Sequence, residues 1–334
     1  MLAASWQRPQ PDLLARALQP LSWIYRGGAA LHRALYTSGL RTRERAPVPL
    51  IVVGNLVAGG AGKTPTVIAL VEQMRQRGCT PGVVSRGYGR RDDALRCVSR
   101  TSAADEVGDE PLLIHLRTGA PVMVAAHRID AARALCAAHP EVDLLIADDG
   151  LQHHALERDA QVIVFDERGA GNGLLLPAGP LREPMPQRTP QRSVVLYNAE
   201  RASTPWPGFV ATRAIAGLAP LADWWHGDRA DARHWAALQG RRVTACAGLA
   251  MPQRFFSMLQ QKGLTIEPIA LPDHASFDDL PWSPSAGDVV LTEKDAVKVR
   301  PERVGDVRVW VAPLDFVLDV QVGATLAQWL PPPR

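Results

Sequence analysis

The glycine-rich segment VAGGAGKT at residues 57–64 constrains the fold of this chain more than any other feature of its sequence. It follows a short apolar run at 50–53, which predicts a strand, and it precedes residues 64–77, which predict a helix that ends at Gly78. A strand, a glycine-rich loop ending in Lys-Thr and a helix form the structural context of a phosphate-binding P-loop. We therefore predict that this segment holds the triphosphate of a nucleotide.

Each residue type in this loop has a physical role in binding phosphate. Glycine allows backbone N–H groups to turn toward the phosphate oxygens, and the N-terminus of the following helix adds the positive end of its dipole. Lys63 is expected to reach the β- and γ-phosphates, and Thr64 to offer its hydroxyl to Mg²⁺. Val57 stands where the common GxxxxGK(S/T) pattern has its first glycine, so the loop resembles the GGxGKT variant. The predicted ATP-binding residues are Val57, Ala58, Gly59, Gly60, Ala61, Gly62, Lys63 and Thr64.

Strand and helix patterns alternate downstream of the loop. Helical patterns at 111–117 and 129–138 lie among apolar runs that predict strands at 82–85, 121–124, 142–147 and 161–165. This alternation predicts an α/β protein with a P-loop NTPase-like, doubly wound parallel sheet. Five prolines fall between residues 177 and 190, where neither a continuous helix nor a central strand tolerates them. We therefore predict a P-loop domain at 47–190 and a second, smaller α/β domain at 191–334, whose first strand is 193–197.

The N-terminal segment, residues 1–46, is basic and amphipathic. It holds seven arginines against Asp12 and Glu44, a net charge of +5, whereas the whole chain carries +3. Apolar residues recur at helical spacing, which predicts an amphipathic helix that is bent or broken near Pro20. Such a helix either lies in a membrane interface with its arginines on anionic lipid or packs on the protein's own core. The residues of this stripe are Leu14, Leu18, Leu21 and Tyr25.

Composition excludes several other classes of protein. No apolar run reaches the roughly 18 residues of a membrane span, and no signal-peptide pattern is present, so we expect a protein that is neither exported nor membrane-spanning. The four cysteines form no CxxC pair, which argues against a zinc site or a disulfide framework. Outside the N-terminal segment the net charge is −2, which argues against nucleic acid as a partner.

Two carboxylates follow the apolar run at 142–147. Asp148 and Asp149 would lie at the carboxyl edge of a parallel sheet, where α/β folds bind ligands, and one of them could hold Mg²⁺. An Asp-Asp-Gly sequence can also be only a turn after a strand. Gln152, His153 and His154 come next, and they either contact a phosphate or are solvated.

Further candidates for the chemistry lie outside these two motifs. Asp109, just before a predicted helix, is either its N-cap, with Glu110 in the first turn, or a carboxylate that accepts a proton from an acceptor hydroxyl. His274 lies in a loop, where a lone histidine is commonly structural. Thr292 and Asp295 have the spacing of a capping box. The last candidates are arginines that either contact phosphate or are ordinary surface residues, Arg86 and Arg182.

Taken together, the motifs resemble one known family. They are GNLVAGGAGKTP (54–65), SRGYGR (85–90), VGDEP (107–111), DDGLQH (148–153), LLPAGPLREP (175–184), PDHASF (272–277) and TEKDAVK (292–298). In this order they resemble the tetraacyldisaccharide 4'-kinases of lipid A (lipopolysaccharide) synthesis. The resemblance implies transfer of the ATP γ-phosphate to the 4'-hydroxyl of an acylated glucosamine disaccharide 1-phosphate, at the cytoplasmic face of the bacterial inner membrane, by a peripheral or monotopic protein.

The resemblance also implies roles for individual residues. Asp109 and His274 would act together as catalytic base, and Asp148 and Asp149 would hold Mg²⁺ with Gln152 close by. The second domain would close over the nucleotide cleft, and residues 1–46 would associate with the membrane. Ala275 departs from the second histidine or aromatic residue that many members carry there.

The competing interpretation is a nucleotide-switch ATPase or GTPase of the GGxGKT group, which hydrolyses nucleotide without phosphorylating an acceptor. Ala58 stands where many such switches have a lysine, and an Asp-His loop suits an acceptor hydroxyl better. Both observations favour a kinase.

Overall fold

A parallel sheet forms the framework of the first part of the chain. In the computed structural model, which describes residues 2–331, its strands lie in the order β2 (Pro81–Ser85), β5 (Leu144–Asp148), β1 (Leu50–Gly54), β6 (Ala160–Asp166), β7 (Ser193–Asn198) and β8 (Phe209–Val210). Neighbouring strands in this order run parallel. Every residue of β1 and β5 is buried, which explains why both read as continuous apolar runs.

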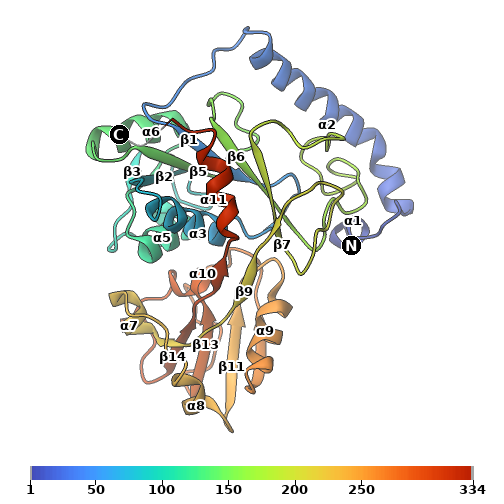
Figure 1. Cartoon of the computed structure of the whole chain (residues 1–334). Coiled ribbons are helices and arrows are strands. Elements are labelled where there is room, and N and C mark those ends of the chain that lie inside the picture. The colour runs from blue at the N-terminus through green and yellow to red at the C-terminus, as the bar shows by residue number, and fades with distance from the viewer. Residues whose placement is uncertain (1, 332–334) are drawn as a thin grey trace. The chain divides into compact units, whose positions relative to one another are not determined.

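Helices cover this sheet (Figure 1). α3 (Lys63–Arg75) begins at the P-loop and packs against β1, β2 and β5, and α6 (Arg128–Ala138) packs against β2. α11 (Val320–Ala327), from the end of the chain, packs against α3 and β7. The predicted fold class, a P-loop-like α/β sheet with a second α/β unit and an N-terminal helical segment, is confirmed.

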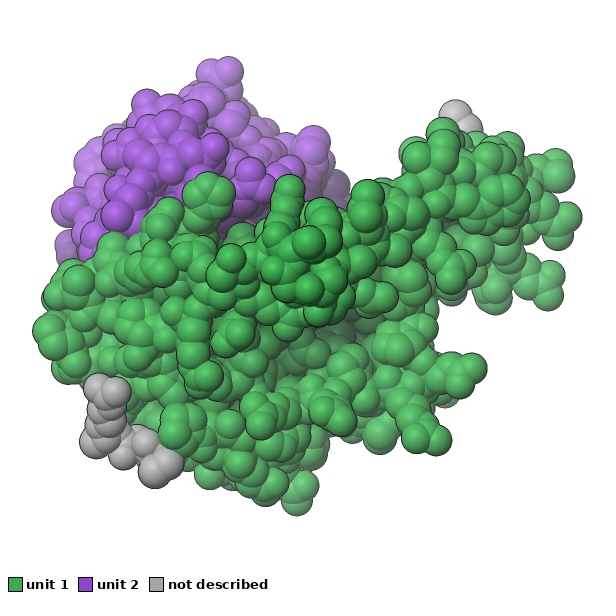
Figure 2. Space-filling model, turned by 90° about the horizontal axis from the view of Figure 1, so that it is seen from above, with its two compact units in different colours: residues 1–85, 127–212, 317–334 green, residues 86–126, 213–316 purple. Residues whose placement is uncertain are grey.

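The chain divides into two compact units, coloured separately in Figure 2. Unit 1 takes the described residues of 1–85, 127–212 and 317–334, and unit 2 takes 86–126 and 213–316. The boundaries therefore differ from the predicted junction near residue 190. They fall partly within β9 (Thr212–Ala214) and β15 (Asp315–Val317), which form a two-stranded sheet.

The proline-rich segment is part of unit 1, because its backbone pairs with the residues that lead from β1 into the P-loop. Leu181 forms an antiparallel bridge with Val57, and the Arg182 N–H donates to the Leu56 carbonyl oxygen at 2.8 Å. The strand predicted at 193–197 also belongs here, since β7 pairs with β6 along its length. Prolines remove donors only at their own positions, so the residues between them still form these hydrogen bonds.

Unit 2 contains a smaller sheet in the order β10 (Ala219–Pro220), β14 (Arg308–Ala312), β13 (Asp288–Thr292), β11 (Arg242–Ala247) and β12 (Thr265–Ala270). β10 is antiparallel to β14, and the other neighbours are parallel. β3 (Arg96–Cys97) and β4 (Val122–Val124) form a further antiparallel pair. The remaining helices of this unit are α4 (Ala104–Val107), α5 (Asp109–Thr118), α7 (Leu221–His226), α8 (His234–Leu238), α9 (Pro252–Gln261), α10 (Glu293–Ala296) and the short 3-10 helix Pro301–Arg303.

The N-terminal segment forms a short helix, α1 (Leu2–Trp6), and a long one, α2 (Leu13–Thr37). Asp12 caps α2 by accepting a hydrogen bond from the Ala15 N–H at 2.9 Å. The helix was predicted to be bent or broken near Pro20; it is not broken there, since α2 runs through Pro20 as one helix (Figure 1). Pro20 and Arg16 are exposed, so water can satisfy the Arg16 carbonyl group that loses its helical hydrogen bond.

Only small side chains of α2 are buried against the rest of unit 1. The Ser22 hydroxyl donates to the Leu175 carbonyl oxygen at 2.9 Å, and Ala15 is also buried, whereas Leu13, Trp23 and Ile24 are exposed. Among residues 2–331, no helix is both long enough and apolar enough to cross a membrane.

Candidate active site

The P-loop of unit 1 follows β1 and turns into α3 at Gly62. Gly62 has a φ of +94°, and a Cβ at this position would lie 2.3 Å from Nδ2 of Asn198. That amide donates to the Ala61 carbonyl oxygen at 3.1 Å, so the side chain at the end of β7 supports the loop. Only glycine combines this backbone conformation with so close an approach.

Asn55, which follows β1 directly, holds the inside of the loop. Its amide nitrogen donates to the carbonyl oxygens of Val57 at 2.6 Å and Gly59 at 3.0 Å. Its amide oxygen accepts from the Lys63 ammonium at 3.5 Å. One buried side chain therefore fixes both the shape of the loop and the direction of the lysine.

The outer side of the loop is held by an arginine from the end of β6. The Arg168 guanidinium pairs with Asp166, with Nε 3.0 Å from one carboxylate oxygen and Nη2 2.8 Å from the other, and Nη2 also donates to the Gly60 carbonyl oxygen at 3.1 Å. Such a bidentate pair holds the guanidinium in one orientation. Asn55, Asp166, Arg168 and Asn198 were not predicted, and only their positions at strand ends could have indicated them.

Asp148 and Asp149 lie at the carboxyl edge of the sheet beside the P-loop, as predicted. Asp148 is the last residue of β5, 1% exposed, and pairs in register with Val53 of β1. Asp149 has a positive φ of 47° and lies 3.6 Å from Lys63 Nζ. The Arg128 guanidinium donates to both aspartate carbonyl oxygens, at 3.2 and 2.7 Å, which fixes this turn.

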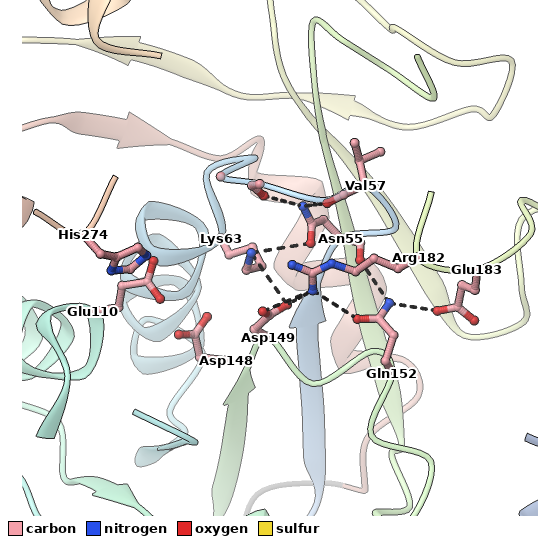
Figure 3. Close-up of polar contacts among 12 residues, drawn as sticks. Asn55, Val57, Lys63, Glu110, Asp148, Asp149, Gln152, Arg182, Glu183 and His274 are labelled. Atoms are coloured by element: carbon pink, nitrogen blue, oxygen red, sulfur yellow. Dashed lines mark hydrogen bonds and ion pairs between the residues drawn. The ribbon is translucent and has the colours of Figure 1, made fainter. Parts of the chain in front are cut away.

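Arg182 and Gln152 complete this group of side chains (Figure 3). Arg182 donates to the two carboxylate oxygens of Asp149 at 3.2 and 3.3 Å and to the Gln152 amide oxygen at 3.4 Å. The Gln152 amide nitrogen donates to Glu183 at 2.9 Å. The structure thus brings together the predicted residues Lys63, Asp149, Gln152 and Arg182, with Thr64 buried in the first turn of α3.

A second group of predicted residues meets within unit 2. His274 Nδ1 lies 3.0 Å from Asp109 Oδ2, and the ring of Tyr88 contacts the imidazole edge-to-face at 5.1 Å. His274 has a positive φ of 60°, a conformation that costs energy for a residue with a side chain. Lys298 holds this loop by donating to the Ala275 carbonyl oxygen at 2.9 Å.

Asp109 is the first residue of α5, and Gly108, not Asp109, is the N-cap. Its Oδ1 accepts from the Glu110 N–H at 2.9 Å, while Oδ2 faces His274. Asp109 is therefore not the N-cap that competed with the catalytic interpretation, since among the described residues the only helix N–H group that its carboxylate accepts from is that of the adjacent Glu110. Thr292 is the N-cap of α10, since its hydroxyl accepts from the Asp295 N–H, but the predicted capping box is only half formed, because the Asp295 carboxylate accepts from the Thr292 hydroxyl and the Gly248 N–H.

Lys294, between these two capping residues, was not predicted as a site residue. Its ammonium lies 3.1 Å from His274 Nε2, 3.3 Å from Glu110 and 2.9 Å from Asp273. An ammonium group can only donate, so Nε2 accepts and the imidazole hydrogen lies on Nδ1, which donates to Asp109. The TEKD sequence suggested only a helix cap, because the partners of Lys294 are 21 and 184 residues away.

The charges in unit 2 shift the pKa values of this group. Burial would raise the pKa of Asp109, but the hydrogen bond from His274 and the charge of Lys294 lower it below its usual value. The hydrogen bond to Asp109 raises the pKa of His274, against burial and the repulsion from Lys294. Burial would lower the pKa of Lys294, but the carboxylates of Glu110, Asp109 and Asp273 raise it overall. Lys294 therefore stays a cation.

Arg86 is the predicted site residue that joins neither group through a direct contact. It is exposed and forms no hydrogen bond or ion pair with any residue in the range 2–331. Glu110 does join the second group, through its ion pair with Lys294.

Comparison with known proteins gives consistent matches along almost the whole chain. The family model described as tetraacyldisaccharide-1-P 4'-kinase matches residues 14–331. A tetraacyldisaccharide 4'-kinase from Methylibium petroleiphilum is 54% identical over 94% of this chain and 89% of that protein. One from Leptothrix cholodnii is 53% identical over 100% of this chain and 97% of that protein.

A solved structure has the same architecture. The crystal structure of LpxK from Aquifex aeolicus in complex with ATP superimposes with a TM-score of 0.76 at 25% sequence identity. The match covers 96% of this chain and 100% of the other.

The two neighbours of His274 should shift its pKa in opposite directions. We expect NMR titration to give a pKa above the usual 6.5 in the native protein, a lower one in Asp109→Asn and a higher one in Lys294→Met. Because the folded-state pKa is raised, His274 contributes stability below the unfolded value near 6.5, and this is lost as pH rises through the folded pKa. His274→Gln should thus destabilise the protein more in mild acid than in mild base.

The matched control for this titration is Asp306→Asn, which removes an exposed carboxylate of unit 2. It should leave the His274 titration where it is. A His274 pKa that responds equally to all three substitutions would contradict a specific Asp109–His274–Lys294 arrangement.

Proposed function

This chain belongs to the tetraacyldisaccharide-1-P 4'-kinase family, and we propose that it transfers the γ-phosphate of ATP to the 4'-hydroxyl of an acylated glucosamine disaccharide 1-phosphate. The observation that carries this proposal is the P-loop with Lys63 3.6 Å from the carboxylate of Asp149, which follows Asp148 at the end of β5. ATP as the donor is further supported by the ATP complex of the Aquifex aeolicus relative.

We propose that unit 1 binds the nucleotide. The P-loop N–H groups and the start of α3 would contact the phosphates, and Lys63 would move from Asp149 to the β- and γ-phosphate oxygens. Arg182, already fixed by Asp149 and Gln152, can add a guanidinium to the same phosphates.

We also propose that Mg²⁺ binds with the nucleotide. Thr64 offers a hydroxyl, and Asp148 and Asp149 offer carboxylates, which are the hard oxygen donors that this ion prefers. Mg²⁺ commonly takes one or two carboxylates and fills its coordination with water and substrate phosphate, so this set of donors is sufficient. When bound, the ion would neutralise charge on the phosphate oxygens.

Unit 2 would supply the group that accepts the proton of the 4'-hydroxyl. The Asp109–His274 pair is hydrogen-bonded and carries one carboxylate charge, so it can take up one proton, on His274 Nε2, as the hydroxyl oxygen attacks phosphorus. Nε2 accepts from the Lys294 ammonium at 3.1 Å in this structure, so that hydrogen bond would have to give way when the 4'-hydroxyl binds. Lys294 acts as a positioning residue, because its ammonium keeps the imidazole hydrogen on Nδ1. Glu110 and Asp273 in turn hold Lys294.

A lipid substrate is supported by a groove in unit 1. It has a volume of about 450 Å³ and lies between α2 and the segment around residues 170–187. Its walls include Trp23, Leu175, Met185 and Trp206. We propose that an acyl chain of the substrate lies in this groove, because contact between the chain and these apolar side chains removes both surfaces from water, which is favourable.

The exposed face of α2 supports association with an anionic membrane surface, which we place at the cytoplasmic face of the bacterial inner membrane. Leu13, Trp23 and Ile24 are 84%, 66% and 73% exposed. Arginines lie on the same helix, as expected for a helix that rests in a lipid interface with its cations on anionic headgroups. The other sequence interpretation, packing on the protein's own core, does not account for these exposed side chains.

Transfer of label tests the function directly. Incubation with γ-labelled ATP and the acylated disaccharide 1-phosphate should place label on the lipid at the 4' position. Lys63→Ala should lose both ATP affinity and transfer, because it removes the cation that reaches the β- and γ-phosphates. Label that appears only as inorganic phosphate, whether or not the lipid is present, would instead indicate a nucleotide switch.

Vesicle co-sedimentation tests the role of α2. Trp23→Ser with Ile24→Ser should weaken binding to vesicles that contain anionic lipid by at least about tenfold. The reason is that burying one such apolar side chain in the lipid interface contributes roughly 1.5–3 kcal/mol to the binding free energy. The control is Val320→Ser, which removes an apolar side chain on α11 that is 72% exposed. Equal binding by both variants would overturn the membrane role of α2.

A further inference from the structure

A second polar pocket in unit 1 lies away from the P-loop. It has a volume of about 280 Å³, and its lining includes four arginines, Arg43, Arg45, Arg158 and Arg192. Leu50 at the start of β1 also lines it, together with Asp159, which precedes β6. These are the amino ends of parallel strands, whereas the P-loop follows the carboxyl end of β1. The pocket is therefore at the opposite edge of the sheet from the nucleotide site.

Hydrogen bonds hold two of the arginines in this pocket. Arg158 donates to the Leu151 carbonyl oxygen and to the Gln161 amide oxygen, both at 3.0 Å. Arg45 pairs with Asp159 at 3.1 Å, and the other oxygen of Asp159 accepts from the Leu50 N–H at 2.9 Å. The carboxylate of Asp159, one of the two acidic side chains in the lining, is thus already engaged by one cation and one backbone donor.

The other two arginines have no such partner. The guanidinium groups of Arg43 and Arg192 form no ion pair or hydrogen bond with any residue that the structure describes. Arg192 also has a positive φ of 52°. Among residues 2–331, the only other non-glycine residues with positive φ are Asp149 and His274, both candidate site residues. Strained backbone of this kind concentrates at functional sites.

The charges around the pocket are not balanced. Four arginines face Glu157 and Asp159, a net charge of +2. Burial, followed by the charges of Arg158 and nearby basic residues including Arg43, lowers the pKa of His154 to about 4, so its imidazole is neutral near pH 7. Burial likewise lowers the pKa of Arg158, and Arg43 adds to this effect.

We propose that this pocket binds a phosphate group, as a second anion site separate from the nucleotide site. A phosphate monoester carries up to two negative charges, which would match the net charge of +2 of the lining. Planar guanidinium groups suit phosphate because they donate in parallel pairs, and a neutral His154 can add one more donor. The volume is at the lower limit of roughly 300–1,000 Å³ for small-molecule pockets, which fits a phosphate headgroup rather than a whole nucleotide.

Binding of inorganic phosphate tests the site independently of kinase activity. The full chain is first saturated with a non-hydrolysable ATP analogue, so that the P-loop is occupied. Inorganic phosphate is then titrated while the His154 ring is followed by NMR. We expect one saturable transition, with the pKa of His154 rising above about 4 as the anion offsets the arginine charges.

Arg→Gln substitutions inside and outside the pocket distinguish binding at this site from a general effect of positive surface charge. Arg43→Gln with Arg192→Gln should weaken phosphate binding at least about tenfold, since both remove charge-assisted donors. Arg188→Gln, which removes an exposed arginine of unit 1 outside the pocket, should leave it unchanged. Arg158 is left intact because its hydrogen bonds support the fold. Absence of a saturable His154 response, or equal affinity in the double variant, would overturn the proposal.

Vesicles distinguish a lipid headgroup from a soluble phosphate. Phosphatidylcholine vesicles with and without phosphatidic acid are compared for the native chain and the double variant. If the ligand is a lipid headgroup, the double variant loses the additional binding that phosphatidic acid gives, and free phosphate competes. If the ligand is soluble, the double variant binds both kinds of vesicle as the native chain does, while its phosphate titration is still weakened. Either result supports a phosphate-binding pocket and shows whether its ligand is a lipid headgroup or a soluble phosphate.

Discussion

The pairing of β1 with β5 is the interaction on which the nucleotide site depends. Both strands are buried along their whole length, and their parallel register places Val53 opposite Asp148. The P-loop leaves the end of one strand, and the two aspartates leave the end of the other. A slip of one residue would turn every side chain of β5 to the other face of the sheet, so the buried packing of this pair also fixes where the carboxylates lie.

The nucleotide site and the proposed phosphate pocket lie at opposite edges of the same sheet. At its carboxyl edge, carbonyl groups of the P-loop are held by Asn55, Asn198 and Arg168, and the cations are Lys63 and Arg182. At its amino edge, the cations are the four arginines that line the pocket of about 280 Å³. In unit 2 the arrangement is different, because a buried carboxylate, Asp109, faces an imidazole whose other nitrogen is occupied by an ammonium group. Such a group suits proton transfer rather than phosphate binding, because Nε2 can accept a proton once the Lys294 ammonium releases it.

Much of the nucleotide site could be predicted from the sequence, because the P-loop and the Asp148–Asp149 turn are short segments whose structure follows from local pattern. An amphipathic helix within residues 1–46 and most strands could be predicted for the same reason, but the unbroken course of α2 through Pro20 could not. The unit boundaries could not, since they depend on which strand β7 pairs with and on hydrogen bonds between Leu56 and Arg182. Lys294 was missed because its partners are distant in sequence, and pairing Asp109 with His274 needed the family resemblance.

The proposal that Asp109 and His274 act as one base is tested most directly by a double-mutant cycle on label transfer at saturating ATP. We expect Asp109→Asn and His274→Gln each to lower kcat by roughly 10²–10⁴, with ATP affinity retained. The double variant should lose little more than either single variant, because groups that act as a unit are not additive. Losses that multiply in the double variant, or weakened ATP binding with unchanged kcat, would contradict a shared role.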